Sequence, residues 1–488
     1  MTFRKTETEN KPEYLLRLAL FAFFAILLFY RLCIAFSFKH ELVNGESNNI
    51  WNAMNVAHGK PIYTNPEALP LEVFQYTPLS QIPIISYAYL LDDTSPYYLY
   101  WITVLGRLTA LAANCITAWL IVRLLKEVFQ IPSNLAFAGG IMVLTSFTHA
   151  AFAVRPDALT LLVSTWVSIG FFRAIHSDKQ RNLIVFSFLT AFAVLFKQDA
   201  FFVLVPVGIF LLYERKWYQV IYISASLILG LLLFLGAGQL LFGQFFLYSI
   251  TQGIKTPGHL SQAFLVFDKF TSVFLIQFIL GVVIAGYYIF SEKENRLVSL
   301  LSITFISLLT LAFTGSFKSG AWINYYSSAI IWSVPLIVFY FVKSHQKYVL
   351  LLLIISVNTV FFFRQAYFYT MPFVQPLSAK EKYIEKHDLA IALKNKLDLN
   401  PSTKLIVIDP MVRNFLFKNS IMVNMEFYGV STFNYDAIRK DQKQAIRFLV
   451  YENNEVGIID MLDDKFRFEK QKFKLINKIG TIGIYGRK

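Results

Sequence analysis

The stretch "YLLRLALFAFFAILLFYRLCIAF", residues 14–36, decides the class of fold. A helix of this length can cross the hydrocarbon core of a bilayer, which is roughly 30 Å thick. No small-residue cleavage site follows it, so the sequence predicts a retained first span and not a signal peptide. The chain of 488 residues is 56% hydrophobic and only 16% charged, against about 25% charged in an ordinary soluble protein. These features predict a polytopic α-helical membrane protein.

Similar apolar runs recur along the chain and predict about eleven spans. The pair of runs around "FKQDAFF" is close enough to be a single broken hairpin instead. The predicted spans are residues 14–36, 97–125, 133–149, 157–175, 182–197, 198–214, 217–241, 269–290, 297–315, 322–342 and 347–366.

Charge asymmetry between the loops predicts the orientation in the membrane. The net charge is +14, and in a membrane protein such an excess reports basic cytoplasmic loops and not nucleic-acid binding. With the N-terminus in the cytoplasm and an odd number of spans, the C-terminus lies outside. Every short inside segment is then basic, as these residues show: Arg4, Lys5, Lys11, Arg17, Arg123, Lys126, Arg173, Lys179, Arg181, Arg215, Lys216, Lys293, Arg296, Lys343 and Lys347.

The compact loops favour a bacterial inner membrane. The two cysteines, Cys33 and Cys115, both fall within apolar runs, so no disulfide is expected.

The composition changes after the last span, which predicts two parts. Residues 1–375 form the membrane part, and residues 376–488 form a small extracytoplasmic α/β domain. In the second part, residues 378–397 and 436–451 have helical periodicity. The stretches "KLIVID", "EVGIID" and "KLINKIGTIGIYG" are typical of strands.

The first outer loop, residues 37–96, contains "NGESNNIWNAMNVAHGKPIYTNP" at residues 44–66. This stretch and residues 71–91 predict two helices that lie at the membrane interface. Glu46 would stand at the start of the first helix. Taken alone, Glu46 and Ser47 could serve only as a helix cap, because a carboxylate is stabilised at a helix N-terminus.

An acidic residue after the first span, a short helix, Gly-x-Pro with an aromatic residue and then "YTPL" together resemble the GT-C superfamily. The likeness is greatest to its protein mannosyltransferase and aminoarabinose transferase branches. These are integral-membrane glycosyltransferases that use polyprenyl-phosphate sugars. The resemblance covers the whole architecture, but the family often has Asp-Glu where this chain has Gly45 and Glu46. It therefore implies that Glu46 alone is the catalytic general base, with Glu41 as a second candidate.

Several polar motifs fall on the predicted outer face, and cations among them could hold a lipid phosphate. Each motif also has a structural alternative: an Arg–Asp pair at a helix end, a snorkelling lysine, or an interfacial anchor rich in tyrosine. The candidates for donor phosphate and sugar binding are Arg155, Lys197, Gln198, Lys318, Asn324 and Tyr325, with Asp157 and Asp199 as supporting acids.

The function expected from the resemblance is an inverting transfer of a sugar from a polyprenyl-phosphate donor to an acceptor hydroxyl on the outer side. The acceptor is a glycan, a lipid or a protein. Metal dependence stays open, since some members of the superfamily use a divalent cation and Glu46 with Asp157 could bind one. The alternative is a transporter or flippase for a lipid-linked glycan, which would place charges near the midplane of the bilayer.

Overall fold

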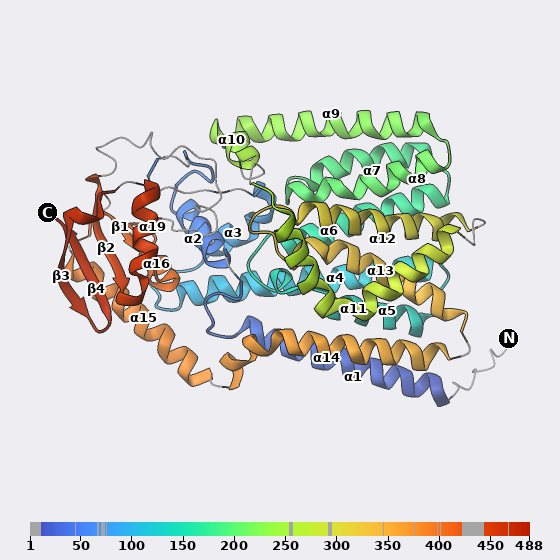
Figure 1. Ribbon diagram of the computed structural model, residues 1–488, viewed down its shortest axis with the longest axis horizontal. Helices are drawn as coiled ribbons and strands as arrows, with labels where there is room; N and C mark the ends of the chain where they lie inside the picture. The colour runs from blue at the N-terminus through green and yellow to red at the C-terminus, as the bar shows by residue number, and fades with distance from the viewer. Residues whose placement is uncertain are drawn as a thin grey trace.

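The computed structural model describes residues 11–488 except 44, 66–67, 70–73, 75, 253–256, 291–294, 345, 375, 398, 401, 422–443 and 467. Long helices lie side by side in one part of the molecule, and a mixed α/β domain covers one end of them (Figure 1). The first described helix, α1, begins at the far end of the helices from that domain.

Each predicted span overlaps a helix in the structure. By length and composition, the described residues contain seven helices able to cross a membrane and three shorter apolar ones, so the count of eleven spans stays a prediction. The helices are α1 (Lys11–Ala35), α4 (Tyr98–Glu127), α5 (Ser133–Thr145), α6 (Asp157–His176), α7 (Gln180–Ala193), α8 (Leu204–Tyr213), α9 (Trp217–Phe242), α11 (Leu260–Phe290), α12 (Arg296–Gly315), α13 (Ser327–Val342) and α14 (Lys347–Val374).

The run predicted to span residues 182–197 ends earlier than expected. Helix α7 stops at Ala193, and a 3-10 turn at Gln198–Val203 leads into α8. The break leaves Lys197 in an extended conformation between two apolar segments. The Lys197 ammonium group therefore lies in the connection between α7 and α8, where polar side chains from other segments can pair with it.

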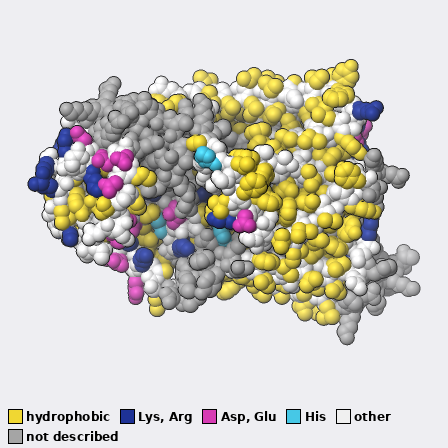
Figure 2. Space-filling view, viewed as in Figure 1, with side chains coloured by type: hydrophobic (Ala, Val, Ile, Leu, Met, Phe, Trp, Pro, Cys, Tyr) yellow, Lys and Arg dark blue, Asp and Glu magenta, His cyan; other side chains and the backbone are white. Residues whose placement is uncertain are grey.

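Hydrophobic side chains cover the visible surface of the helical part, and charged side chains gather over the α/β domain and at the opposite tip (Figure 2). The loops predicted to be cytoplasmic pair with one another. Arg173 lies 2.5 Å from Glu127, and Arg296 forms an ion pair with Glu214. These loops therefore lie together at one end of the helices, as the charge pattern requires.

The first outer loop contains the two expected helices, α2 (Glu46–Ala57) and α3 (Ile82–Leu90). Helix α3 exposes large hydrophobic residues such as Tyr89 and Leu90, as an interfacial helix should. Helix α2 is different, because most of its residues are buried. It is enclosed between the membrane helices and the α/β domain, where the Trp51 indole donates a 2.9 Å hydrogen bond to Ser420.

The α/β domain begins with α15 (Pro376–Lys396), as expected. Four strands form one sheet in the order β1-β2-β4-β3: β1 (Lys404–Val407), β2 (Ile446–Glu452), β3 (Phe473–Ile479) and β4 (Ile482–Arg487). Strands β1 and β2 are parallel, and the other pairs are antiparallel. The short helix α16 (Pro410–Phe415) follows β1 and is capped by the Asp409 side chain.

Two predictions in this domain are wrong. The helix expected over 436–451 is strand β2 from Ile446 onward, because the apolar "IRFLVY" pairs in the middle of the sheet; residues 436–443 lie outside the described part of the chain. The strand expected at "EVGIID" is helix α19 (Val456–Phe466), whose buried residues Ile459 and Leu462 recur at helical spacing.

Close packing between α6 and α7 gives a test of the fold. Gly170 lies against the Phe186 ring, where an added Cβ would clash, whereas Gly208 in α8 has no atom within 4 Å of the same position. We expect Gly170→Ala to destabilise the protein by about 1–3 kcal/mol, because the ring must move out of a well-packed interface. Gly208→Ala is the control and should be neutral or stabilising. The melting temperature of the detergent-purified protein measures both, and equal values would contradict this packing.

Candidate active site

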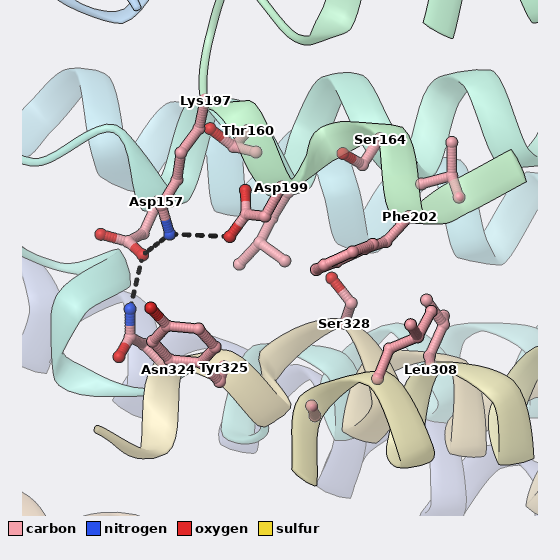
Figure 3. A pocket seen from close by; sticks show the side chains of 14 residues that line it. Asp157, Thr160, Ser164, Lys197, Asp199, Phe202, Leu308, Asn324, Tyr325 and Ser328 are labelled. Carbon is pink, nitrogen blue, oxygen red and sulfur yellow. Dashed lines mark hydrogen bonds and ion pairs between the residues drawn. The ribbon is translucent and has the colours of Figure 1, made fainter. Parts of the chain in front are cut away.

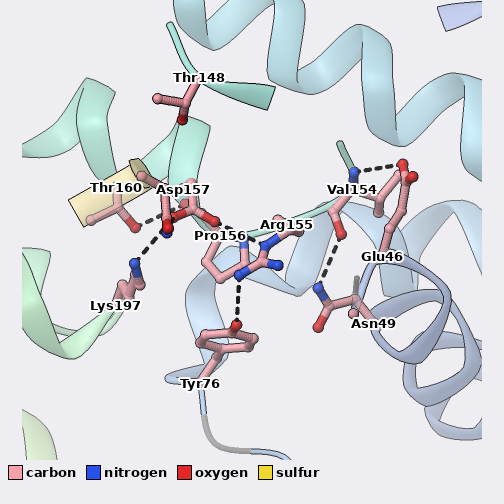
Figure 4. Close-up of polar contacts among 12 residues, drawn as sticks. Glu46, Asn49, Tyr76, Thr148, Val154, Arg155, Pro156, Asp157, Thr160 and Lys197 are labelled. Atoms are coloured by element: carbon pink, nitrogen blue, oxygen red, sulfur yellow. Dashed lines mark hydrogen bonds and ion pairs between the residues drawn. The ribbon is translucent and has the colours of Figure 1, made fainter. Parts of the chain in front are cut away.

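Two polar clusters meet at the segment between α5 and α6 (Figure 4). One cluster surrounds Glu46 at the start of α2, and the other surrounds Asp157 at the start of α6. Val154 contacts the first cluster and Arg155 the second. The sequence predicted that these outer motifs converge, and the structure places them next to one another.

Glu46 has no solvent-exposed surface. Its carboxylate accepts two hydrogen bonds from Arg107, at 2.9 Å from Nε and 3.0 Å from Nη2. It also accepts from the backbone N–H of Leu42 at 2.6 Å and of Val154 at 2.9 Å. Each carboxylate oxygen therefore accepts two hydrogen bonds in this structure. Through these bonds Glu46 links the first outer loop, α4 and the segment before α6.

The second cluster is centred on the Asp157 carboxylate (Figure 3). Oδ1 accepts hydrogen bonds from Lys197 at 3.1 Å and from Asn324 at 2.9 Å. Oδ2 accepts one from Arg155 Nε at 3.1 Å. Lys197 also lies 2.9 Å from Asp199. Residues from three separate loops thus form one network of charges.

This network closes one end of a pocket that has an apolar wall. The polar end is formed by Asp157, Lys197, Asn324 and the Tyr325 hydroxyl group, and Figure 3 shows Phe202 and Leu308 farther along the same space. The remaining lining residues are Thr160, Leu161, Ser164, Asp199, Val203, Leu311, Ala312 and Ser328. A charged end with an apolar wall suits a ligand that joins a polar headgroup to a hydrocarbon chain.

Lys197 lines this pocket and Lys318 does not, but the charge of Lys197 acts on Lys318, and the two lysines have opposite electrostatic environments. Burial alone would lower the pKa of Lys197, but the charges of Asp157 and Asp199 outweigh it and raise the pKa above its ordinary value. Burial lowers the pKa of Lys318 to about 8, and the charge of Lys197 adds to that effect. An anion bound between them would favour the charged form of Lys318.

The other predicted residues lie around this network. Arg155 also donates a 3.2 Å hydrogen bond to the Tyr76 hydroxyl group, which brings the "YTPL" motif of the first loop to the site. Gln198 opens the 3-10 turn next to Lys197 but is not among the pocket-lining residues. Gly45, which precedes Glu46, has a positive φ of 86°, and a Cβ there would lie 3.7 Å from Arg155 Nη1.

Glu41 lies on the other side of Gly45 and is only partly buried. Its Oε1 accepts hydrogen bonds from Gly45 N at 3.0 Å and from the Ser47 hydroxyl at 3.0 Å. Burial raises the pKa of Glu41 above its ordinary value, and the charge of Glu46 acts in the same direction.

The α/β domain reaches the same loop through α16. Arg413 donates hydrogen bonds to Ser47 Oγ at 3.1 Å and to Asn48 Oδ1 at 2.7 Å. Asn414 donates to the Ser47 carbonyl at 3.0 Å. The start of α2 is therefore held from two sides, by the membrane helices and by the α/β domain.

A divalent cation does not fit between Glu46 and Asp157 in this arrangement. Every oxygen of the two carboxylates already accepts hydrogen bonds from cationic or N–H donors. Across the described residues, no three His, Cys, Asp or Glu side chains lie close enough to hold a metal ion.

Sequence reasoning missed Arg107, which pairs with Glu46, and Tyr76, which contacts Arg155. A signal for Arg107 was present, because a charge inside the apolar run 97–125 is costly unless it has a buried partner. Tyr76 carried no such signal, since tyrosine is common at membrane interfaces.

Comparison with known proteins agrees with this architecture. Residues 103–237 match the family model of the dolichyl-phosphate-mannose-protein mannosyltransferases. No match is found among curated protein sequences.

Two solved structures share the fold over nearly the whole chain. One is ArnT from Cupriavidus metallidurans bound to undecaprenyl phosphate, with a TM-score of 0.61 and 11% identity, covering 95% of this chain and 97% of that one. The other is the oligosaccharyltransferase AglB from Archaeoglobus fulgidus with an inhibitory peptide and a dolichol phosphate. Its TM-score is 0.54 and its identity 10%, covering 96% of this chain and 74% of that one. The resemblance to the GT-C superfamily is thus confirmed, and the chain has the fold of these two proteins.

Proposed function

We propose that this protein is a glycosyltransferase that moves a sugar from a polyprenyl-phosphate donor to an acceptor hydroxyl group on the extracytoplasmic side of the membrane. The observation that carries this proposal is the pocket whose charged end adjoins an apolar wall. The fold shared with ArnT, whose structure contains undecaprenyl phosphate, supports the same class of donor.

The donor phosphate binds at the charged end, next to Lys197 and Lys318. Lys197 is shared between Asp157 and Asp199 in this structure, so the phosphate competes with carboxylates for it. Asn324 and Tyr325 face the same space and orient the sugar or its phosphate. The polyprenyl chain follows the apolar wall toward the bilayer.

The reaction is one displacement at the anomeric carbon, with inversion. The acceptor oxygen forms the new bond as the bond from carbon to the phosphate oxygen breaks, and the phosphate leaves with the electron pair. The cations at the pocket stabilise the charge that develops on the leaving oxygen. A carboxylate takes the proton of the acceptor hydroxyl.

Two carboxylates are candidates for this base. The resemblance implied Glu46, but a carboxylate that accepts four hydrogen bonds and has no exposed surface must first lose Arg107 to reach an acceptor. We therefore propose that Glu41 is the base and that Glu46 positions the loop. Glu41 is partly exposed, and its raised pKa makes it a better proton acceptor.

Replacement of Lys197 tests the donor site. We expect Lys197→Ala to weaken binding of undecaprenyl phosphate by about 10- to 100-fold, because a charge-assisted hydrogen bond contributes about 1.5–3 kcal/mol. Lys197→Arg should retain most of the affinity. Lys179→Ala, in an exposed loop at the other end of the helices, is the matched control. Affinity measured on the detergent-purified protein checks all three, and unchanged binding by Lys197→Ala would rule out this donor site.

Substitution by glutamine separates the roles of the two glutamates. We expect Glu41→Gln to lower turnover by about 10²- to 10⁴-fold with an unchanged melting temperature, since only the base is lost. Glu46→Gln should destabilise the protein by about 3–5 kcal/mol, because Arg107 loses its buried partner. Sugar transfer and thermal melting are measured on the same samples. If Glu41→Gln turns over normally while Glu46→Gln melts normally but is inactive, Glu46 is the base.

A further inference from the structure

A small pocket beside the first outer loop contains parts of two buried arginines. It is lined by Arg31, Ile34 and Ala35 of α1, by Arg107 and Leu111 of α4, and by Phe152. It shares no lining residue with the pocket around Lys197. Its free space is about the size needed for one water molecule or one oxygen atom of a larger ligand.

Nitrogen atoms of both arginines are left without partners there. Arg31 is 5% exposed and Arg107 is 1% exposed. Nη1 and Nη2 of Arg31 and Nη1 of Arg107 are buried and have no hydrogen-bond partner within the described residues. Leaving a buried donor unsatisfied costs free energy, and more when the donor carries a charge. An acceptor in the pocket would remove this cost.

The local charges leave one positive charge uncompensated. Glu46 neutralises Arg107 through two hydrogen bonds. Arg31 has no carboxylate partner among the described residues, and its guanidinium carbon lies 3.5 Å from the centre of the Phe152 ring and 5.6 Å from that of Phe147. A ring face stabilises a desolvated cation, but it accepts no hydrogen bond from the N–H groups that lie in the guanidinium plane.

We propose that this pocket binds an anionic phosphate oxygen between Arg31 and Arg107. A guanidinium group offers several N–H donors in a plane, which suits a phosphate better than a neutral acceptor. The position favours the outer headgroup region, because Arg31 is close to the end of α1 at Ala35 and Arg107 Nη2 also donates to the Lys39 carbonyl at 2.8 Å. The phosphate is either a free ion or part of a lipid headgroup.

This site is separate from the donor site and does not depend on the proposed transfer reaction. Phe152 lies in the segment that connects α5 to α6, and Asp157 is the first residue of α6, so the two sites contact the chain five residues apart.

The test uses the full chain and compares phosphate-dependent stabilisation in two variants. The melting temperature is measured in detergent without phosphate and with increasing inorganic phosphate, and in nanodiscs of phosphatidylcholine with and without phosphatidylglycerol. The variants are Arg31→Gln and the control Arg123→Gln, an exposed arginine at the other end of α4. All are repeated in a Lys197→Ala background, which removes the contribution of the donor site.

We expect phosphate or phosphatidylglycerol to stabilise the wild type and Arg123→Gln, and Arg31→Gln to require at least about tenfold more ligand. Without ligand, Arg31→Gln should melt no lower than the wild type, because it removes an unpaired buried charge. Stabilisation by inorganic phosphate identifies a free-ion site, and stabilisation only in phosphatidylglycerol nanodiscs identifies a lipid headgroup site. The proposal is overturned if Arg31→Gln responds like the wild type, or if neither ligand stabilises the wild type because the pocket binds only water.

Discussion

The buried ion pair between Glu46 and Arg107 is the interaction on which the site depends. It joins the first outer loop to α4, and the same carboxylate holds the backbone at Val154. Val154 is followed by Arg155 and, two residues after that, by Asp157. By holding the backbone N–H of Val154, Glu46 helps to position Arg155 and Asp157, the first residues of the second polar cluster. A buried pair of this kind adds little net stability compared with apolar residues, but losing one partner is costly. Its value here is the geometry that it imposes.

The geometry places charges only where partners or a polar ligand can compensate them. Asp157 is surrounded by three donors, and Lys197 by two carboxylates, at the point where α7 ends and the chain turns. The apolar wall of the pocket begins directly beside this network. The lining of the pocket thus changes from charged to apolar side chains along its length, as a ligand with a phosphate headgroup and a lipid chain would require. The α/β domain also contacts the first loop, because Arg413 donates hydrogen bonds to Ser47 and Asn48 at the start of α2. Helix α2 is therefore packed between the α/β domain and the membrane helices.

Much of this arrangement could be predicted from the sequence because the signals are local. Long apolar runs identify the helices, and basic loops gather at one end of them. The convergence of Asp157, Lys197, Asn324 and Tyr325 followed from placing their loops on one face. The sequence could not show that Glu46 is enclosed by Arg107, since that contact joins residues 61 positions apart. The strand at Ile446–Glu452 was mistaken for a helix because pairing in the centre of a sheet overrides local periodicity.

A structure of the protein in nanodiscs with undecaprenyl phosphate is the most direct test of the central claim, that the charged end of the pocket is a lipid-phosphate site. The account predicts the phosphate within hydrogen-bond distance of Lys197 Nζ, with the first isoprene units beside Phe202 and Leu308. A phosphate bound elsewhere, with the Lys197 ion pairs to Asp157 and Asp199 unchanged, would contradict it.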